Sequence, residues 1–188
     1  MIDRLEFEKE VWYRVFNEAV RIVSEKLRSV DDWPRVKAML AKVIARVLIE
    51  RFRTVELIAY TELSGGEYVD DYEGGFDIDL LIRVGSEAEA YALKNLEPII
   101  DNALKEAIVY SKDKGFLRRM GEKYGKGIYH NIVELHVNDT YVEAALGEGP
   151  YHPPTILYRR KEPCPPPGRR GRRGCSTQPS RPLFSQPS

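Results

Sequence analysis

The sequence predicts a small α/β (α+β) domain in which a mixed β-sheet carries helices mainly on one face. Three observations support this fold class. Apolar residues recur every three or four positions over the first fifty residues, which is typical of amphipathic helices. Two apolar, strand-like runs follow at 54–63 and 76–84, with paired glycines between them. From residue 159 the composition shifts to proline, arginine and glycine, which predicts a disordered tail.

These observations divide the chain into three parts. Residues 1–53 are predicted to be N-terminal helices packed on the domain, 54–158 the domain itself, and 159–188 a disordered basic tail. A chain of 188 residues with 43% hydrophobic content is long enough to bury one good core. The tail holds eight of the 29 Lys and Arg residues and one of the 29 acids, so the remainder has 21 basic against 28 acidic residues. The predicted folded part is therefore acidic.

The composition also indicates where the protein works. No apolar stretch approaches the ~20 residues that a membrane-spanning helix needs. The first residues, Met1 to Glu6, are too charged for a signal peptide, so we expect a cytoplasmic protein without a membrane partner. Both cysteines, Cys164 and Cys175, lie in the tail, which leaves the domain without a disulfide or a cysteine metal site. The abundance of Glu, Lys and Arg gives the hypothesis of a thermophilic source.

The helical periodicity predicts two helices before the first strand and one after the second. The first spans about 5–27, and the second about 35–53, after an acidic cap and an early proline at 31–34. The third begins after Ser86, a good N-cap residue, and runs to about Tyr110. The aromatic and methionine positions on these helices are interpreted as core, because their spacing is helical.

Two carboxylates stand on one face of the strand predicted at 76–84. Alternation places Phe76, Ile78, Leu80, Ile82 and Val84 together on an apolar face. Asp77 and Asp79 then share the opposite face, and two residues of strand advance about 6.6 Å, which leaves room for a divalent cation between the carboxylates. Without a cation, like charges at this spacing disfavour joint ionisation. The alternative is a solvated edge strand that carries two surface acids.

The segment at 111–127 and the strand that follows it complete the predicted domain. Lysines, arginines and glycines fill 111–127, so this segment is predicted to be a solvated loop, with contact to phosphates as the alternative. The next strand, 128–137, places Glu134 on one face together with Ile132 and His136. The spacing of His130 and His136 matches no zinc motif, so both histidines are interpreted as incidental. Residues 156–158 are apolar enough to dock on the domain.

The order of these motifs resembles a known superfamily. A strand is followed by Gly65-Gly66, a ten-residue spacer and the run Asp77-Ile78-Asp79-Leu80. This pattern is similar to that of the polymerase-beta-like nucleotidyltransferase superfamily, in its minimal form. The resemblance covers residues 54 to 84. It implies a nucleotidyltransferase-like mixed sheet with flanking helices.

The resemblance also implies an activity and a site. The activity is metal-dependent transfer of a nucleoside monophosphate from a nucleoside triphosphate to a hydroxyl of a protein, RNA or small molecule. Asp77 and Asp79 would bind Mg²⁺ or Mn²⁺, with Glu134 as the third carboxylate, and Gly65 and Gly66 would cradle the phosphates.

The alternative reading comes from a different class of protein. The spacer between the glycines and Asp77 is acidic and contains no arginine, unlike the spacer of the minimal superfamily members. These features favour a non-catalytic binding protein with the same fold, such as an antitoxin-like partner of a small helical toxin subunit.

Overall fold

The computed structural model describes residues 4–61, 75–126, 130–140, 142 and 154–161. They form four α-helices, a short 3-10 turn and a four-stranded sheet, which confirms the predicted mixed α/β fold class. The elements in chain order are α1 (Arg4–Lys26), η1 (Val30–Asp32), α2 (Trp33–Arg51), β1 (Val55–Thr61), β2 (Ile78–Val84), α3 (Glu87–Ser111), α4 (Lys114–Lys123), β3 (Val133–Val137) and β4 (Thr155–Arg159).

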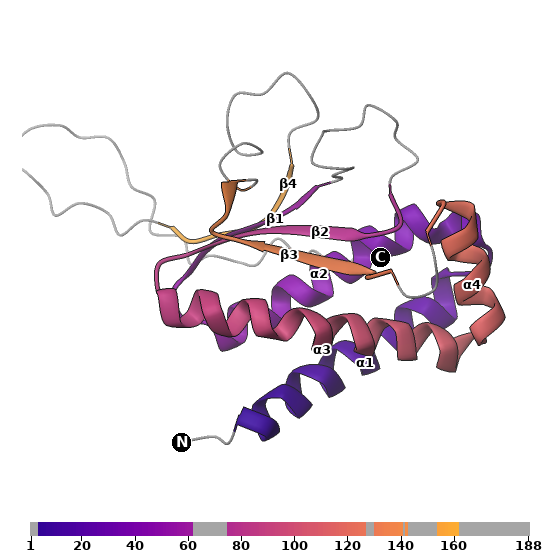
Figure 1. Cartoon of the computed structure of the whole chain (residues 1–188), viewed down its shortest axis with the longest axis horizontal. Coiled ribbons are helices and arrows are strands. Elements are labelled where there is room, and N and C mark those ends of the chain that lie inside the picture. Colours follow the sequence, from indigo (N-terminus) through magenta and orange to yellow (C-terminus); the bar gives the residue numbers. More distant parts are fainter. Residues whose placement is uncertain (1–3, 62–74, 127–129, 141, 143–153, 162–188) are drawn as a thin grey trace, which may run out of the picture.

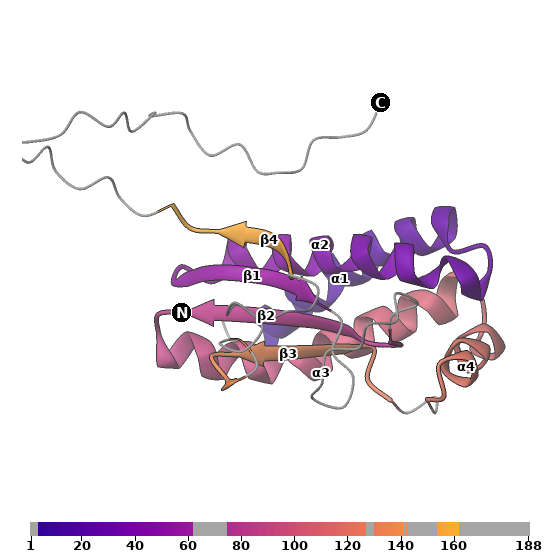
Figure 2. The same cartoon turned by 90° about the horizontal axis from the view of Figure 1, so that it is seen from above.

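The sheet is mixed, and its strand order is β3-β2-β1-β4 (Figure 2). Strand β1 runs antiparallel to both β2 and β4, whereas β2 and β3 are parallel. Parallel neighbours need a long crossover, and α3 and α4 supply it between β2 and β3. This crossover places the second half of the predicted site on the strand next to β2.

Helices α1, α2 and α3 cover one face of the sheet (Figure 1). The predicted apolar side chains of the second strand, from Phe76 to Val84, all lie in the main core between sheet and helices. A smaller apolar cluster occupies the other face and consists of Leu57, Ala59, Leu81 and Val142 with Ile156 against it. Alternation along β2 therefore directs the carboxylates of Asp77 and Asp79 to the face away from the helices.

The N-terminal helices belong to the same core as the sheet. Helix α1 packs against α3 and α2, and its buried side chains Val11, Val15 and Ala19 lie in the main apolar cluster. Trp33 at the start of α2 is fully buried in that cluster. No helix within the described part of the chain is long and apolar enough to cross a membrane.

The prediction of a loop at 111–127 is wrong, because most of this segment is helix α4. The side chain of Asp113 caps the helix by accepting a hydrogen bond from the backbone N–H of Phe116 at 2.6 Å. Phe116, Leu117 and Met120 are buried, so packing overrides the low helix propensity of the glycines. Gly125 follows the helix with a φ of 67°, the left-handed conformation that glycine adopts without strain.

Two predicted boundaries also change. Strand β3 begins at Val133, and Ile132 packs in the main core on the helix side instead of sharing a face with Glu134. Residues 156–158 dock as predicted, but they do so as part of β4, which includes Arg159. The backbone N–H of Arg160 donates to the carbonyl of Glu56 at 2.8 Å, so ordered structure extends past the predicted start of the tail. Residues 162–188 of that tail lie outside the described residues.

Candidate metal centre

The parallel pairing of β2 with β3 brings the three predicted carboxylates to one place. The register sets Asp79 directly beside Glu134, and side chains at paired positions of a sheet lie on the same face. Asp77 stands immediately before β2, two residues from Asp79 and on the same face. The apolar helices lie on the other side of the sheet, so the carboxylates meet on the face opposite the main core.

Helix α2 fixes the backbone that leads into Asp77. The indole Nε1 of Trp33 donates to the carbonyl of Phe76 at 2.9 Å, and the Nζ of Lys37 donates to the carbonyl of Gly75 at 2.7 Å. Both donors are fully buried, and their spacing of four residues puts them on one side of the helix. Sequence reasoning missed Lys37, because a lysine within a helix is usually solvated.

Side chains of helix α3 bind the backbone of β3 and of the residue before it. The Oδ1 of Asp101 accepts a hydrogen bond from the N–H of Ile132 at 2.6 Å, and the Oε2 of Glu97 accepts one from the N–H of Leu135 at 2.9 Å. These two contacts flank Glu134 in sequence. The backbone that carries Glu134 is therefore fixed on one side by β2 and on the other by α3.

The carboxylates are crowded and largely removed from solvent. Asp79 is 2% exposed and Asp77 is 8% exposed, whereas Glu134 is half-buried. Burial raises the pKa of Glu134, and the charges of Asp79 and Asp77 raise it further, against a smaller opposing effect of His136. Within the part of the chain that the structure describes, the buried Oδ1 of Asp77 accepts no hydrogen bond. A cation at this position would relieve both the repulsion and the unpaired oxygen.

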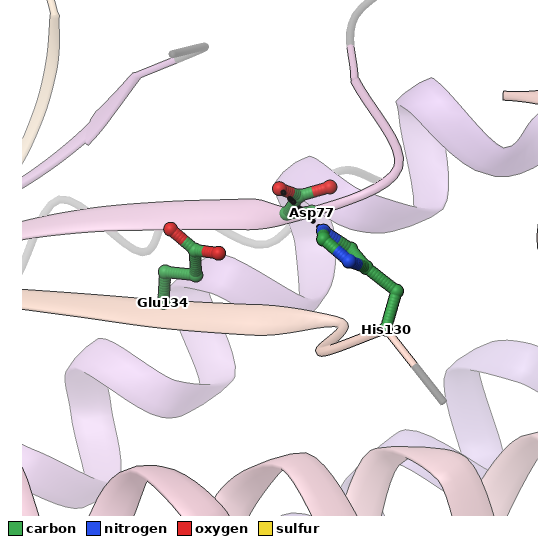
Figure 3. Close-up of side chains that lie close together, drawn as sticks. All are labelled: Asp77, His130 and Glu134. Carbon is green, nitrogen blue, oxygen red and sulfur yellow. Dashed lines mark ion pairs between the residues drawn. The ribbon is translucent and has the colours of Figure 1, made fainter. Parts of the chain in front are cut away.

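Both histidines, which the spacing led us to interpret as incidental, lie directly against these carboxylates. The Nε2 of His130 is 3.5 Å from the Oδ2 of Asp77, and the side chains of Asp77, His130 and Glu134 converge between β2 and β3 (Figure 3). The Nε2 of His136 lies 3.4 Å from Asp79 Oδ1 and 3.8 Å from Glu134 Oε2. His136 could have been found from sequence, because it follows Glu134 by two residues on the same strand. His130 lies outside the observed strand, in a stretch where alternation fails, because Ile132 packs in the main core instead of on the face of Glu134.

The environment of His136 favours its charged form. A hydrogen bond to Asp79 raises the pKa of His136 against the effect of burial, and the charges of Asp79 and Asp139 raise it further. The Nδ1 of the same ring lies 3.2 Å from the Oδ2 of Asp139. The ring is therefore held between carboxylates at both of its nitrogens.

The described residues contain two groups that could hold a metal ion. One consists of Asp77, His130 and Glu134, and the other of Asp79, Glu134 and His136. Within each group the donor atoms lie within 4.8 Å of one another, and Glu134 belongs to both. Oxygen and imidazole nitrogen donors, together with the unpaired Oδ1 of Asp77, fit a divalent cation.

Comparison of the chain with protein-family models, with curated proteins and with solved structures gives no match. The resemblance to nucleotidyltransferases therefore stays a prediction from the motif at residues 54 to 84. Gly65 and Gly66, the predicted phosphate-binding pair, lie outside the described residues. The chemistry of the site therefore has to be argued from the carboxylates and histidines in and just before β2 and β3.

Proposed function

We propose that the chain is a metal-dependent nucleotidyltransferase that moves a nucleoside monophosphate from a nucleoside triphosphate to a hydroxyl acceptor. One observation carries the proposal: the parallel register sets Glu134 beside Asp79, and Asp77 completes a cluster on the face away from the helices. The sequence motif names the same three carboxylates. Mg²⁺ or Mn²⁺ fits carboxylate oxygens of this kind, and the donor set includes three of them.

The reaction is a displacement at the α-phosphorus. The acceptor hydroxyl oxygen forms a bond to that phosphorus, the bond to the oxygen bridging to the β-phosphorus breaks, and pyrophosphate leaves with that electron pair. The hydroxyl proton passes to solvent. When bound, a divalent cation supplies charge neutralisation on the triphosphate oxygens and on the attacking oxygen.

The chain's own residues position these groups. Asp77, directly before β2, and Asp79 within it would hold the cation, and their burial keeps water from competing with them. Glu134 would hold it from β3, and its side chain is 38% exposed, which leaves it open to an incoming acceptor. Trp33 and Lys37 hold the backbone before Asp77 by a hydrogen bond each. In this proposal Gly65 and Gly66 bind the β- and γ-phosphates through backbone N–H groups.

A second function is a binding module that keeps the fold and lacks transfer activity. The acidic spacer at 67–76 favours it, because Glu67, Asp70, Asp71 and Glu73 would repel a triphosphate. Its partner would be a small helical protein, such as the toxin of a toxin–antitoxin pair.

A labelling experiment tests the proposal. The full chain is incubated with each α-³²P-labelled nucleoside triphosphate, Mg²⁺ or Mn²⁺, and a mixture of protein and RNA acceptors. We expect label in an acceptor with the wild type and a loss of at least about 100-fold with Asp79→Asn, since this charge acts on the transition state. Glu106→Gln, an exposed acid on α3, is the matched control and should transfer label normally.

The same variants separate the two functions by stability. A cation that binds only the folded protein raises its melting temperature by mass action, and Asp77→Asn and Asp79→Asn should remove that increase. Metal-dependent stabilisation without transfer of any of the four nucleotides would favour the binding module. A melting temperature indifferent to divalent cations in the wild type would contradict the metal centre itself.

A further inference from the structure

The imidazole–carboxylate distances at the two histidines are long for hydrogen bonds and close to the distance between two ligands of one metal ion. Good N–H···O hydrogen bonds have donor–acceptor distances near 2.9 Å. The imidazole–carboxylate pairs of the centre are longer, at 3.5 Å for His130 with Asp77, 3.4 Å for His136 with Asp79 and 3.8 Å for His136 with Glu134. Two donors at about 2.1 Å from one tetrahedral ion are about 3.4 Å apart. The observed separations are close to that value.

The His130 side of the centre has two buried polar atoms that lack hydrogen bonds. Among the described residues, neither Oδ1 of Asp77 nor Nε2 of His130 has a hydrogen-bond partner. Asp77 is 8% exposed, so its unpaired oxygen is shielded from water. Leaving buried polar groups unpaired destabilises the folded protein. A cation bound by both residues would remove this cost.

The His136 side has a support that aims the ring. The Oδ2 of Asp139 lies 3.2 Å from Nδ1 of His136, which leaves Nε2 directed at Asp79 and Glu134. A carboxylate behind a ligand histidine fixes its tautomer and orientation at metal sites. Asp139 is itself held in place, because Asn138 before it adopts a φ of 49° and exchanges two side-chain hydrogen bonds with the backbone of Val84, at 2.9 and 2.7 Å.

We infer that His130 and His136 are metal ligands, and that the centre selects a later first-row transition-metal dication, such as Zn²⁺, over Mg²⁺. The His130 site consists of Asp77, His130 and Glu134, and the His136 site of Asp79, Glu134 and His136. Mg²⁺ prefers oxygen ligands alone, whereas imidazole suits the later transition metals. The inference rests on the proposed function, because it names the cation that would serve that reaction. Its test measures binding only.

The test titrates single metals into the full chain after removal of bound metal with EDTA. Calorimetry with Zn²⁺ alone and with Mg²⁺ alone should give a dissociation constant at least about tenfold lower for Zn²⁺. His130→Ala and His136→Ala should each weaken Zn²⁺ binding by about tenfold or more, with Mg²⁺ binding much less affected. Glu106→Gln should change neither. Bound Co²⁺ gives a second readout, because its visible spectrum should change when either imidazole is removed.

The variant Asp139→Asn covers the case in which a histidine variant fails to fold. Asparagine keeps the Oδ1 acceptor for the N–H of Val142 but replaces the carboxylate behind His136. Loss of such a support weakens metal affinity by about 10 to 100-fold. Equal affinities for Mg²⁺ and Zn²⁺, or histidine and Asp139 variants that bind Zn²⁺ like the wild type, would overturn the inference. Transfer supported by Mg²⁺ would then leave the proposed function intact, whereas tight Zn²⁺ binding without transfer would contradict only that function.

Discussion

The buried carboxylate of Asp101 offers a test of how the sheet is held by its helices. Its Oδ1 accepts from the N–H of Ile132 at 2.6 Å, and its Oδ2 accepts from Nζ of Lys105 at 2.7 Å. Asp101→Ala removes both acceptors and leaves a buried N–H unpaired at the start of β3. Asp101→Asn keeps one carbonyl oxygen for that N–H and is the matched control.

The expected cost follows from these two contacts. An unpaired buried N–H costs about 1–3 kcal/mol, and the lost contact with Lys105 adds up to about 1 kcal/mol because that pair is only partly buried. We therefore expect Asp101→Ala to lower the free energy of unfolding by about 1–4 kcal/mol, and Asp101→Asn by no more than about 1 kcal/mol, since it loses only the charge that pairs with Lys105. For a domain stable by about 5–15 kcal/mol, this is a large fraction of the total.

Urea denaturation followed by far-UV circular dichroism measures both variants. The m-values should equal that of the wild type, so that a shift of the midpoint reports stability alone. Equal losses in the two variants, or a loss below about 0.5 kcal/mol for Asp101→Ala, would refute the reasoning, since the N–H of Ile132 would then have another partner.

Two further predictions concern acid stability and the C-terminal boundary. Although burial opposes it, hydrogen bonds from the hydroxyl and N–H of Thr54 and the N–H of Arg53 hold the pKa of Glu89 below its usual 4.5. This carboxylate therefore stabilises the fold above pH 4.5 and loses its effect as the pH falls through the folded-state pKa. The urea midpoint of Glu89→Gln should consequently change less than that of the wild type between about pH 6 and 3. Identical pH profiles of the two proteins would contradict this prediction. A chain that ends after Tyr158 lacks the hydrogen bond from Arg160 to Glu56, so its free energy of unfolding should be about 0.5–1.5 kcal/mol lower than that of a chain that ends after Lys161. Equal urea midpoints would support the domain boundary after residue 158 that the sequence predicted.

The parts of the fold that follow from periodicity were predictable. Alternation from Phe76 to Val84 assigned the core face of β2 correctly, because both neighbours of this strand are themselves strands and the run is uninterrupted. The same rule singled out Asp77 and Asp79, whereas Glu134 was added as the third carboxylate that the resemblance to nucleotidyltransferases implies. Helix α4 was missed, because Gly115 and Gly121 lower helix propensity, and the burial of Phe116 and Met120 that compensates is a tertiary effect.

The histidines of the centre show a second limit of sequence reasoning. The strand predicted at 128–137 includes His130, but β3 begins only at Val133, so the direction that alternation gives to earlier residues has no basis, as the burial of Ile132 in the main core shows. The approach of His130 to Asp77 depends on the pairing of β2 with β3, which are separated by two helices in sequence. Zinc-motif spacing describes ligands that are close in sequence, and this centre instead collects its ligands from separate elements.

The contact between Glu97 and Leu135 has a consequence for self-association. Strand β3 lies at an edge of the sheet, and an open edge can pair with a strand from another molecule, which is a route to aggregation. Leu135 is the middle residue of β3, and its N–H is already occupied by Glu97, while α3 runs alongside. A foreign strand would have to displace this carboxylate before it could add to the sheet, so α3 protects the edge next to the metal centre from intermolecular pairing.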